Sequence, residues 1–184
     1  MRAFTEGREP DTADELWLCE HPAVYTLGQA GRHEHLHEAG DTPLVETDRG
    51  GQITWHGPGQ LVLYVLLDLR RRGLGVRELV VALENAVIDL LAAEGVRAAG
   101  RRDAPGVYVE GAKIAALGLR VRRGRTYHGL ALNVDCDLAA FDRIDPCGYR
   151  GLAVTRTADL GIGASRAMLG EALLEHVATR LALR

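Results

Sequence analysis

The stretch "GVYVEGAKIAALGLRVRRGRTYHGLALNVD", residues 106–135, decides the fold. It contains three segments, 106–110, 112–122 and 126–135, that are rich in the Val, Ile, Leu and Tyr residues found in strands. Glu110-Gly111 and Arg123-Gly124 separate these segments, and a pair that ends in glycine is typical of a two-residue hairpin turn. The stretch therefore predicts three consecutive antiparallel strands.

Shorter strands precede this stretch, and helices flank it. Segments rich in Val, Leu, Thr and aromatic residues, punctuated by Gly or Pro, predict strands at residues 15–20, 23–29, 43–49, 52–56 and 60–69. Helical patterns lie at residues 76–94, 138–144 and 166–181. The strands are interrupted by helices rather than alternating with them. The chain is therefore predicted to be α+β (mixed α/β), with mostly antiparallel sheets packed with helices.

The composition describes one globular domain. The chain has 184 residues, of which 47% are hydrophobic, so we expect a single domain over residues 1–184. It contains no run of about 18 apolar residues, and its first fifteen residues are polar and acidic, which predicts no membrane span, no signal peptide and a cytoplasmic location. The formal net charge of -3 is not that of a general nucleic-acid binder.

The basic residues are almost all of one kind. Lys and Arg number 22 together, and Lys113 is the single lysine. Arginine serves ion pairs and phosphate contacts, whereas lysine supplies a primary amine and an ammonium that releases its proton more readily. We interpret Lys113 as a residue retained for that chemistry. The alternative is a chance survivor of a codon bias.

The three cysteines are odd in number and widely spaced, which predicts neither a disulfide framework nor a zinc site. Cys19 lies in an apolar strand, where a free cysteine is commonly a small buried hydrophobe. Cys136 lies between Asp135 and Asp137, whose charges oppose a thiolate. Cys19 is therefore predicted to pack in the core, and Cys136 is predicted to be a poor nucleophile.

Cys147 lies in "DPCGYRG", residues 145–151, between a proline and a glycine that bend the chain. Arg143 and Arg150 supply positive charge nearby. A thiol with a pKa near 8.5 is only a few per cent thiolate at neutral pH, and an adjacent ammonium lowers that pKa. Cys147 is therefore the candidate nucleophile, with Lys113 as its candidate partner. A structural turn cysteine is the alternative.

The stretch "RGGQITWHGPGQ", residues 49–60, is a candidate ligand loop. Gly50 and Gly51 let the backbone approach a ligand closely, and "HGPG" forms a rigid turn that places His56 at its mouth. The loop lacks the pattern of a phosphate-binding loop, and no dinucleotide fingerprint occurs, so no nucleotide cofactor is predicted. An ordinary glycine-rich hairpin is the alternative.

The remaining histidines divide into two groups. His33, His35 and His37 alternate in "RHEHLH", but the segment is typical of a loop and no carboxylate or cysteine set completes a ligand pattern, so no metal site is predicted. His128 precedes a glycine near a strand, as His56 does, and is a possible pocket residue.

Arginines cluster at residues 70–72 and at Arg120, Arg122, Arg123 and Arg125. A solvated surface is one interpretation of these clusters. A docking surface for acidic protein partners is the other, because complementary charge speeds association.

The chain closely resembles the lipoyl(octanoyl) transferases, the octanoyl-acyl-carrier-protein:protein transferases. The resemblance rests on "TADELWLCEHPAVYTLGQAG", "DRGGQITWHGPGQLVLYVLLDL", "LGVRELV" and "DAPGVYVEGAKIAALGLRVRRGRTYHGLALNVDCDLAAFDRIDPCGYRG". It covers residues 4–152 almost without gaps and is weak over the last thirty residues. The fold it implies is the catalytic domain of biotin and lipoate protein ligases.

The resemblance implies a ping-pong acyl transfer in lipoate biosynthesis. The thiolate of Cys147 would take an octanoyl group from octanoyl-acyl carrier protein as a thioester and pass it to a lysine ε-amine on an apo lipoyl domain, and Lys113 would lower the thiol's pKa and manage protons. The acceptors would be lipoyl domains of 2-oxoacid dehydrogenase complexes and the glycine cleavage H protein. The implied substrate-binding residues are Arg49, Gly50, Gly51, Gln52, Ile53, Thr54, Trp55, His56, Ala116, Leu117, Gly118, Gly129, Leu130 and Ala131.

The resemblance implies no metal and no cofactor, and we expect a monomer. Family members usually begin with a further strand and helix before the residues that match "FTEGR", residues 4–8, and we expect their lack to affect stability more than chemistry. Three rivals predict different behaviour: an ATP-dependent lipoate or biotin protein ligase, an acyl thioesterase, and a non-enzymatic binder of acyl chains or carrier protein.

Overall fold

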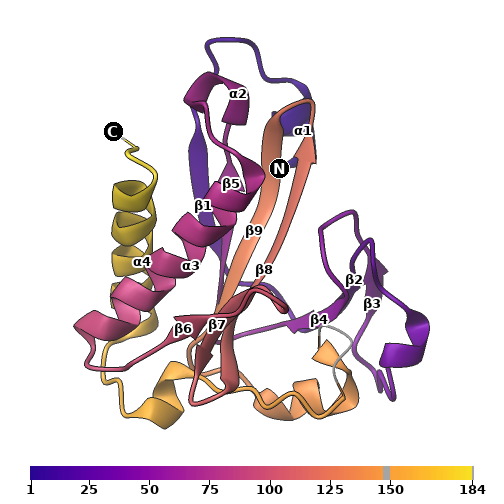
Figure 1. The fold of residues 1–184 in the computed structure, drawn as a ribbon. Coiled ribbons are helices and arrows are strands. Elements are labelled where there is room, and N and C mark those ends of the chain that lie inside the picture. Colours follow the sequence, from indigo (N-terminus) through magenta and orange to yellow (C-terminus); the bar gives the residue numbers. More distant parts are fainter. Residues whose placement is uncertain (147–149, 184) are drawn as a thin grey trace.

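A computed structural model describes residues 1–146 and 150–183, so Cys147, Gly148, Tyr149 and Arg184 lie outside the described residues. Its centre is a six-stranded antiparallel sheet in the order β1-β5-β9-β8-β7-β6 (Figure 1). The bounds are β1 (Glu15–Cys19), β5 (Gln60–Leu66), β6 (Ala99–Gly100), β7 (Gly106–Val109), β8 (Ala112–Arg122) and β9 (Arg125–Asn133).

The stretch 106–135 folds as its pattern predicts. The two turns that join β7, β8 and β9 place both central residues at positive φ, with Glu110 at 49° and Gly111 at 87°, and Arg123 at 54° and Gly124 at 83°. Two residues at positive φ are the signature of the turn whose twist matches an antiparallel hairpin. The prediction of three consecutive strands is confirmed.

A second, smaller sheet stands beside the first. It contains β2 (Val24–Leu27), β3 (Leu44–Glu46) and β4 (Ile53–His56) in the order β3-β2-β4. β2 pairs antiparallel with β4 but parallel with β3. The sequence predicted these strands, but their separation from the larger sheet is set by long-range pairing that a local pattern does not encode.

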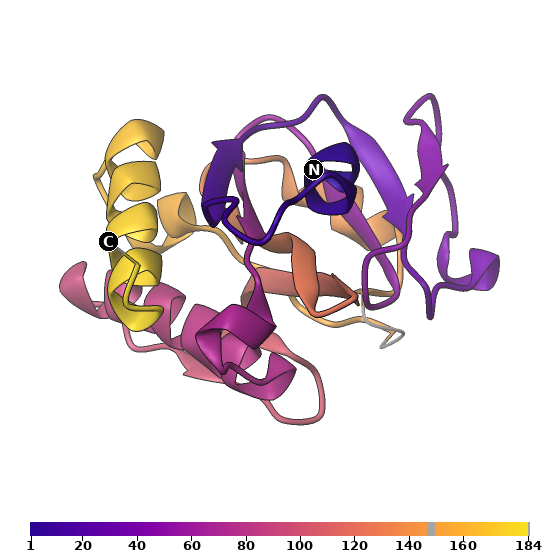
Figure 2. The same ribbon diagram turned by 90° about the horizontal axis from the view of Figure 1, so that it is seen from above.

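Two long helices cover the other face of the larger sheet. α3 (Val76–Ala93) and α4 (Arg166–Arg180) lie on one side of it, and the smaller sheet lies on the other side in both views (Figures 1 and 2). Leu79, Leu83 and Leu90 of α3 are at most 1% exposed and join the main core. Each fully buried leucine contributes about 2 kcal/mol of transfer free energy. The predicted amphipathic helices are confirmed.

Several short elements differ from the prediction. The strand predicted over residues 60–69 ends at Leu66, because the Asp68 side chain accepts hydrogen bonds from the amides of Arg70 and Arg71 and starts α2 (Leu69–Arg72). α1 (Arg2–Glu6) was not predicted. The predicted turns near residue 140 are the 3-10 helix η2 (Leu138–Arg143). In the described part of the chain, no helix combines the length and apolarity needed to cross a membrane.

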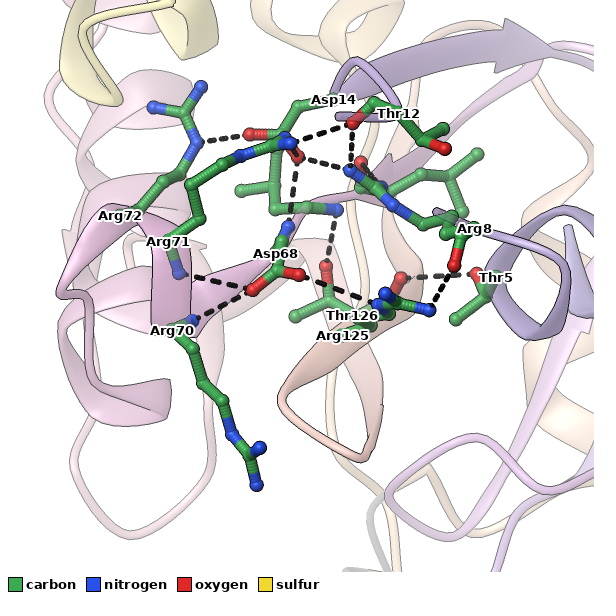
Figure 3. A network of polar contacts seen from close by, with 12 residues as sticks. Thr5, Arg8, Thr12, Asp14, Asp68, Arg70, Arg71, Arg72, Arg125 and Thr126 are labelled. Carbon is green, nitrogen blue, oxygen red and sulfur yellow. Dashed lines mark hydrogen bonds and ion pairs between the residues drawn. The ribbon is translucent and has the colours of Figure 1, made fainter. Parts of the chain in front are cut away.

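Three guanidinium groups surround the carboxylate of Asp14 (Figure 3). Its Oδ1 accepts from Arg8 Nη2 at 2.5 Å and from Arg71 Nη2 at 2.7 Å, and its Oδ2 accepts from Arg72 Nε at 2.5 Å. The Asp68 amide donates to the same Oδ1 at 2.9 Å. The Asp14 side chain is only 5% exposed, so this cluster ties the segment before β1 to α2.

The cluster changes the interpretation of the arginine-rich patches. Arg71 and Arg72 pair inside the molecule with Asp14. Arg125 pairs with Asp68 and Arg122 with Glu6. Each of these four arginines already has an acidic partner within the fold, which favours the solvated-surface interpretation over a docking surface for them.

Replacing Asp14 with asparagine is expected to lower the free energy of unfolding by about 3 kcal/mol, because three guanidiniums lose their shared carboxylate. Burial alone would raise the pKa of Asp14, but the Asp68 amide and the guanidiniums of Arg72 and Arg8 outweigh it and lower that pKa. The ionised carboxylate thus stabilises the fold above about pH 4, and this stabilisation is lost as the pH falls further. Urea unfolding at pH 7 and at pH 3.5 measures both effects.

The matched control is Asp159→Asn, which removes an exposed ion pair with Arg156. Exposed pairs contribute little, so this variant is expected to unfold close to the wild type. Equal unfolding midpoints for Asp14→Asn and Asp159→Asn at pH 7 would contradict the role given to the cluster.

Candidate active site

A cavity of about 170 Å³ lies between the two sheets. Its walls come from β2 and β4 of the smaller sheet and from β5, β8 and β9 of the larger one. Small and aliphatic side chains dominate the walls, as in a pocket for an apolar ligand. Most of the pocket residues proposed from the sequence line it: Arg49, Gly51, Gln52, Ile53, Thr54, His56, Ala116, Leu117, Gly118, His128, Gly129, Leu130 and Ala131.

Two residues of the proposed set, Gly50 and Trp55, are not among those that line the cavity. The side chain of Trp55 is 4% exposed and joins a second core cluster, where its ring meets that of Phe141 edge-on with the centroids 5.8 Å apart. Gly50 instead donates its amide to the Leu119 carbonyl at 3.0 Å. Both residues are therefore neighbours in sequence of residues that line the cavity, without lining it themselves.

Arg49 is 8% exposed and holds the wall together. Its Nε donates to Thr26 Oγ1 at 3.0 Å and its Nη2 to the Thr26 carbonyl at 2.6 Å, and Nη1 donates to the Gly50 carbonyl at 2.9 Å. These bonds connect the glycine-rich loop to β2. Arg49 therefore gives the loop its shape as well as lining the cavity.

Lys113 lies near the start of β8 and is 4% exposed. Its Nζ lies 3.4 Å from the Pro105 carbonyl oxygen and 5.2 Å from the centroid of the Tyr108 ring, and the side chain lines the cavity. An ammonium over an aromatic face gains electrostatic stabilisation. The only lysine of the chain is therefore presented to the pocket.

The residues on both sides of Cys147 are anchored, while Cys147 itself lies outside the described residues. Before it, Pro146 lines the cavity, and Asp145 accepts from His37 Nε2 at 2.9 Å. After it, the amide of Lys113 donates to the Ala153 carbonyl at 2.8 Å, and the Thr155 amide donates to the Lys113 carbonyl at 2.9 Å. The segment after Cys147 thus pairs directly with Lys113.

The other cysteines differ in part from the prediction. Cys19 is half-buried rather than part of the main core, with its Sγ 3.7 Å from His21 Nε2, and burial raises the pKa of its thiol. Cys136 is buried in the second core cluster, and burial raises the pKa of its thiol to about 11. Burial, more than the adjacent carboxylates, therefore makes Cys136 unreactive.

The alternating histidines have a structural role. His35 Nδ1 and His37 Nε2 lie 3.3 Å and 2.9 Å from the two oxygens of Asp145, and His33 lies 3.2 Å from Glu46. Among the residues that the structure describes, no group of three His, Cys, Asp or Glu side chains is arranged to hold a metal ion. Through His35 and His37, the loop anchors Asp145, which lies two residues before Cys147.

Two polar side chains that line the cavity, His21 and Tyr64, were not predicted. His21 Nε2 lies 2.6 Å from the Tyr64 hydroxyl, and burial raises the pKa of Tyr64 to about 12. His128 lies 2.9 Å from Asp48, while burial lowers the pKa of its imidazole. These residues come from segments far apart in the sequence, and no spacing pattern connects them.

Comparisons with known proteins agree with this geometry. The family model for the lipoyl protein ligase A/B catalytic domain matches residues 1–178. An octanoyltransferase of Pseudomonas putida (strain W619) is 63% identical over 181 residues, which cover 98% of this chain and 80% of that protein. An octanoyltransferase of Halorhodospira halophila is 69% identical over 162 residues, which cover 88% of this chain and 75% of that protein.

Solved structures confirm the predicted fold. A putative lipoate protein ligase from T. acidophilum superposes with a TM-score of 0.79 over 98% of this chain and 78% of that one, at 17% identity. A biotin protein ligase from Aquifex aeolicus superposes with a TM-score of 0.58 over 85% of this chain and 70% of that one, at 15% identity.

The fold and the cavity define an α+β catalytic domain of the kind found in lipoate and biotin ligases, and the chain belongs to the lipoyl protein ligase A/B catalytic domain family. Within that family, relatives at 62% to 69% identity place it among the octanoyltransferases. It is an acyltransferase of lipoate biosynthesis that acts on protein substrates in lipoylation. The sequence-based identification is confirmed.

Proposed function

We propose that the chain moves an octanoyl group from octanoyl-acyl carrier protein to a lysine ε-amine on an apo lipoyl domain, through a thioester on Cys147. In the first half-reaction the thiolate of Cys147 attacks the donor thioester. A bond forms between Sγ and the carbonyl carbon, and the bond to the carrier sulfur breaks. The carrier thiolate takes its proton from the ammonium of Lys113.

The position of Lys113 in the structure is the main support for this proposal. Lys113 and Pro146, the residue before Cys147, line the same cavity, and the strand that holds Lys113 pairs with Ala153 and Thr155 on the other side of Cys147. A nearby ammonium favours the thiolate over the thiol. An amine at this place can also exchange protons with the leaving group and the attacking nucleophile.

The cavity supplies the binding energy for the acyl chain. Ala116 faces Ala131 and Gly118 faces Gly129 across β8 and β9, so this part of the wall is made of small residues and leaves room for methylene groups. Each buried methylene contributes about 0.8 kcal/mol. We propose the residues inferred from the resemblance as the substrate-binding set, with Gly50 and Trp55 acting from behind the wall.

The remaining parts of the proposal concern partners and setting. The donor is octanoyl-acyl carrier protein, and the acceptors are lipoyl domains of 2-oxoacid dehydrogenase complexes and the glycine cleavage H protein. We propose that residues 1–184 act as one catalytic domain, as a monomer in the cytoplasm. The proposed route uses neither a metal nor a nucleotide, which distinguishes it from an ATP-dependent ligase.

Intact mass spectrometry tests the proposal. The purified protein is mixed with octanoyl-acyl carrier protein, and an octanoyl adduct is expected on a peptide that contains Cys147. Addition of an apo lipoyl domain is expected to discharge the adduct and to octanoylate that domain without ATP. Acylation of the domain that needs ATP would favour a ligase, and discharge to free octanoate would favour a thioesterase. Failure to form any adduct would favour a non-enzymatic binder.

A further inference from the structure

A chain of hydrogen bonds runs from the cavity to the segment that follows Cys147. His56 Nδ1 lies 2.7 Å from Gln60 Oε1. Gln60 Nε2 donates to Asn133 Oδ1 at 2.9 Å and to the Trp55 carbonyl at 3.3 Å. Asn133 Nδ2 donates to the Thr155 carbonyl at 3.0 Å, and the Thr155 amide donates to the Lys113 carbonyl. His56 is thereby connected to the strand of the proposed catalytic lysine.

The backbone carbonyls of Thr155 and Trp55 determine which atom donates in every hydrogen bond of this series. A carbonyl oxygen only accepts, so the Thr155 carbonyl requires the NH₂ group of Asn133 and leaves Asn133 Oδ1 as an acceptor. The Trp55 carbonyl and Asn133 Oδ1 both require the NH₂ group of Gln60, which turns Gln60 Oε1 toward His56. His56 Nδ1 must therefore carry the hydrogen, and Nε2 must carry the lone pair.

The Nε2 atom of His56, at the cavity end of this chain of hydrogen bonds, can therefore only accept a hydrogen bond. His56 lines the cavity, and among the described residues no hydrogen-bond donor meets Nε2. Burial lowers the pKa of the His56 imidazole to about 4, with further contributions from Arg49, His21 and His128, so the ring is neutral at neutral pH. A neutral acceptor on the cavity wall is suited to a ligand that brings an N–H group.

We propose that Nε2 of His56 accepts a hydrogen bond from the ε-amine of the acceptor lysine and orients its lone pair toward the thioester carbonyl. This inference rests on the proposed function. The octanoyl chain has no N–H or O–H group, whereas the attacking lysine brings an amine to the reacting carbon itself. Gln60 and Asn133 act through His56 and are positioning residues.

The proton balance of the second half-reaction supports a second acceptor beside Lys113. The ε-ammonium of the acceptor carries three protons, and the amide product keeps one. As the nitrogen attacks, the C–N bond forms, the bond from the carbonyl carbon to Sγ of Cys147 breaks, and Cys147 leaves as the thiolate. One proton goes to Nζ of Lys113, which the first half-reaction left neutral. The other leaves by way of Nε2 of His56 to water.

Two substitutions of His56 distinguish the effect of losing the Nε2 lone pair from the effect of losing the hydrogen bond to Gln60. In His56→Asn, the side-chain NH₂ group takes the place of Nδ1 and donates to Gln60, but nothing replaces Nε2. In His56→Gln, the longer side chain reaches the place of Nε2 and offers an amide oxygen there. Rapid-quench mass spectrometry measures two rates for each variant: acylation of Cys147 by octanoyl-acyl carrier protein, and discharge of the acyl-enzyme by an apo lipoyl domain.

We expect the ratio of the discharge rate to the acylation rate to fall about 10- to 100-fold in His56→Asn, which is the effect of losing one hydrogen bond to a charged or reacting group. His56→Gln is expected to recover part of that loss. Thermal unfolding is followed for both variants, and the ratio is interpreted within each variant, so a change in stability alone does not produce the expected result.

Other outcomes overturn the inference in distinct ways. Equal loss in both half-reactions would assign His56 a structural role, and a loss confined to acylation would assign it to the donor. Wild-type rates of both half-reactions in His56→Asn would remove His56 from the reaction. If the wild-type protein formed no adduct on Cys147, the proposed function itself would fail, whereas an adduct with an unchanged ratio would leave that function standing.

Discussion

Cys147→Ser is expected to abolish octanoyl transfer, with a loss of at least about 10⁴-fold. A serine hydroxyl is scarcely ionised at neutral pH and is a poor nucleophile without a dedicated base, so the first bond to the acyl carbon does not form. Removal of a nucleophile is among the largest single effects on an enzyme. The measurement is transfer to an apo lipoyl domain, together with the mass of the protein after exposure to octanoyl-acyl carrier protein.

The chain offers a matched control in Cys19→Ser. Cys19 is half-buried and close to His21, but the pKa of its thiol is raised by burial, and it has no role in the proposed route. This variant is expected to transfer within a few-fold of the wild type. Transfer that survives in Cys147→Ser, or that is lost equally in both variants, would show that the thioester route is wrong.

Lys113→Arg is expected to reduce transfer by about 10³-fold although the positive charge is kept. Guanidinium holds its proton across the physiological range, so arginine neither protonates the departing carrier thiolate nor accepts a proton from the attacking amine. The site is also closely fitted, since Nζ lies 3.4 Å from the Pro105 carbonyl and over the Tyr108 ring. Single-turnover acylation and discharge rates measure the loss.

A second variant, Lys113→Met, separates charge from proton exchange. Methionine is similar in length but uncharged, so the thiolate of Cys147 loses its nearby cation. The rate of alkylation of Cys147 by iodoacetamide, followed by peptide mass against pH, is expected to need a higher pH in Lys113→Met than in the wild type or in Lys113→Arg. Wild-type transfer by Lys113→Arg, or identical alkylation profiles in all three proteins, would contradict the role of Lys113.

The sequence predicts well those features that depend on near neighbours. Both hairpin turns follow from a glycine at the second turn position, and α3 follows from leucines at helical spacing. The contrast between one lysine and many arginines singles out Lys113, which the structure places in the cavity. Each of these signals is contained within a few residues or in the composition.

The features that the sequence does not predict depend on contacts between distant segments. Trp55 and Thr54 are adjacent, but Thr54 lines the cavity while Trp55 packs against Phe141, a residue from a distant segment. Gln60 and Asn133 meet because β5 pairs with β9 in a register that brings these residues opposite each other. The ion pairs of Arg71 and Arg72 were not predicted because their partner, Asp14, lies far before them in the chain.

The pairing of Lys113 with the segment after Cys147 has a consequence for how this family can vary. Pro146 lines the cavity at one end of the connection, and Ala153 is bonded to Lys113 at the other end. Residues 147–152 must therefore cover a fixed distance. Substitutions in this connection leave the distance as it is, whereas an inserted or deleted residue changes the length of chain between the two anchored ends. Its length is thus expected to be constrained more strictly than its composition.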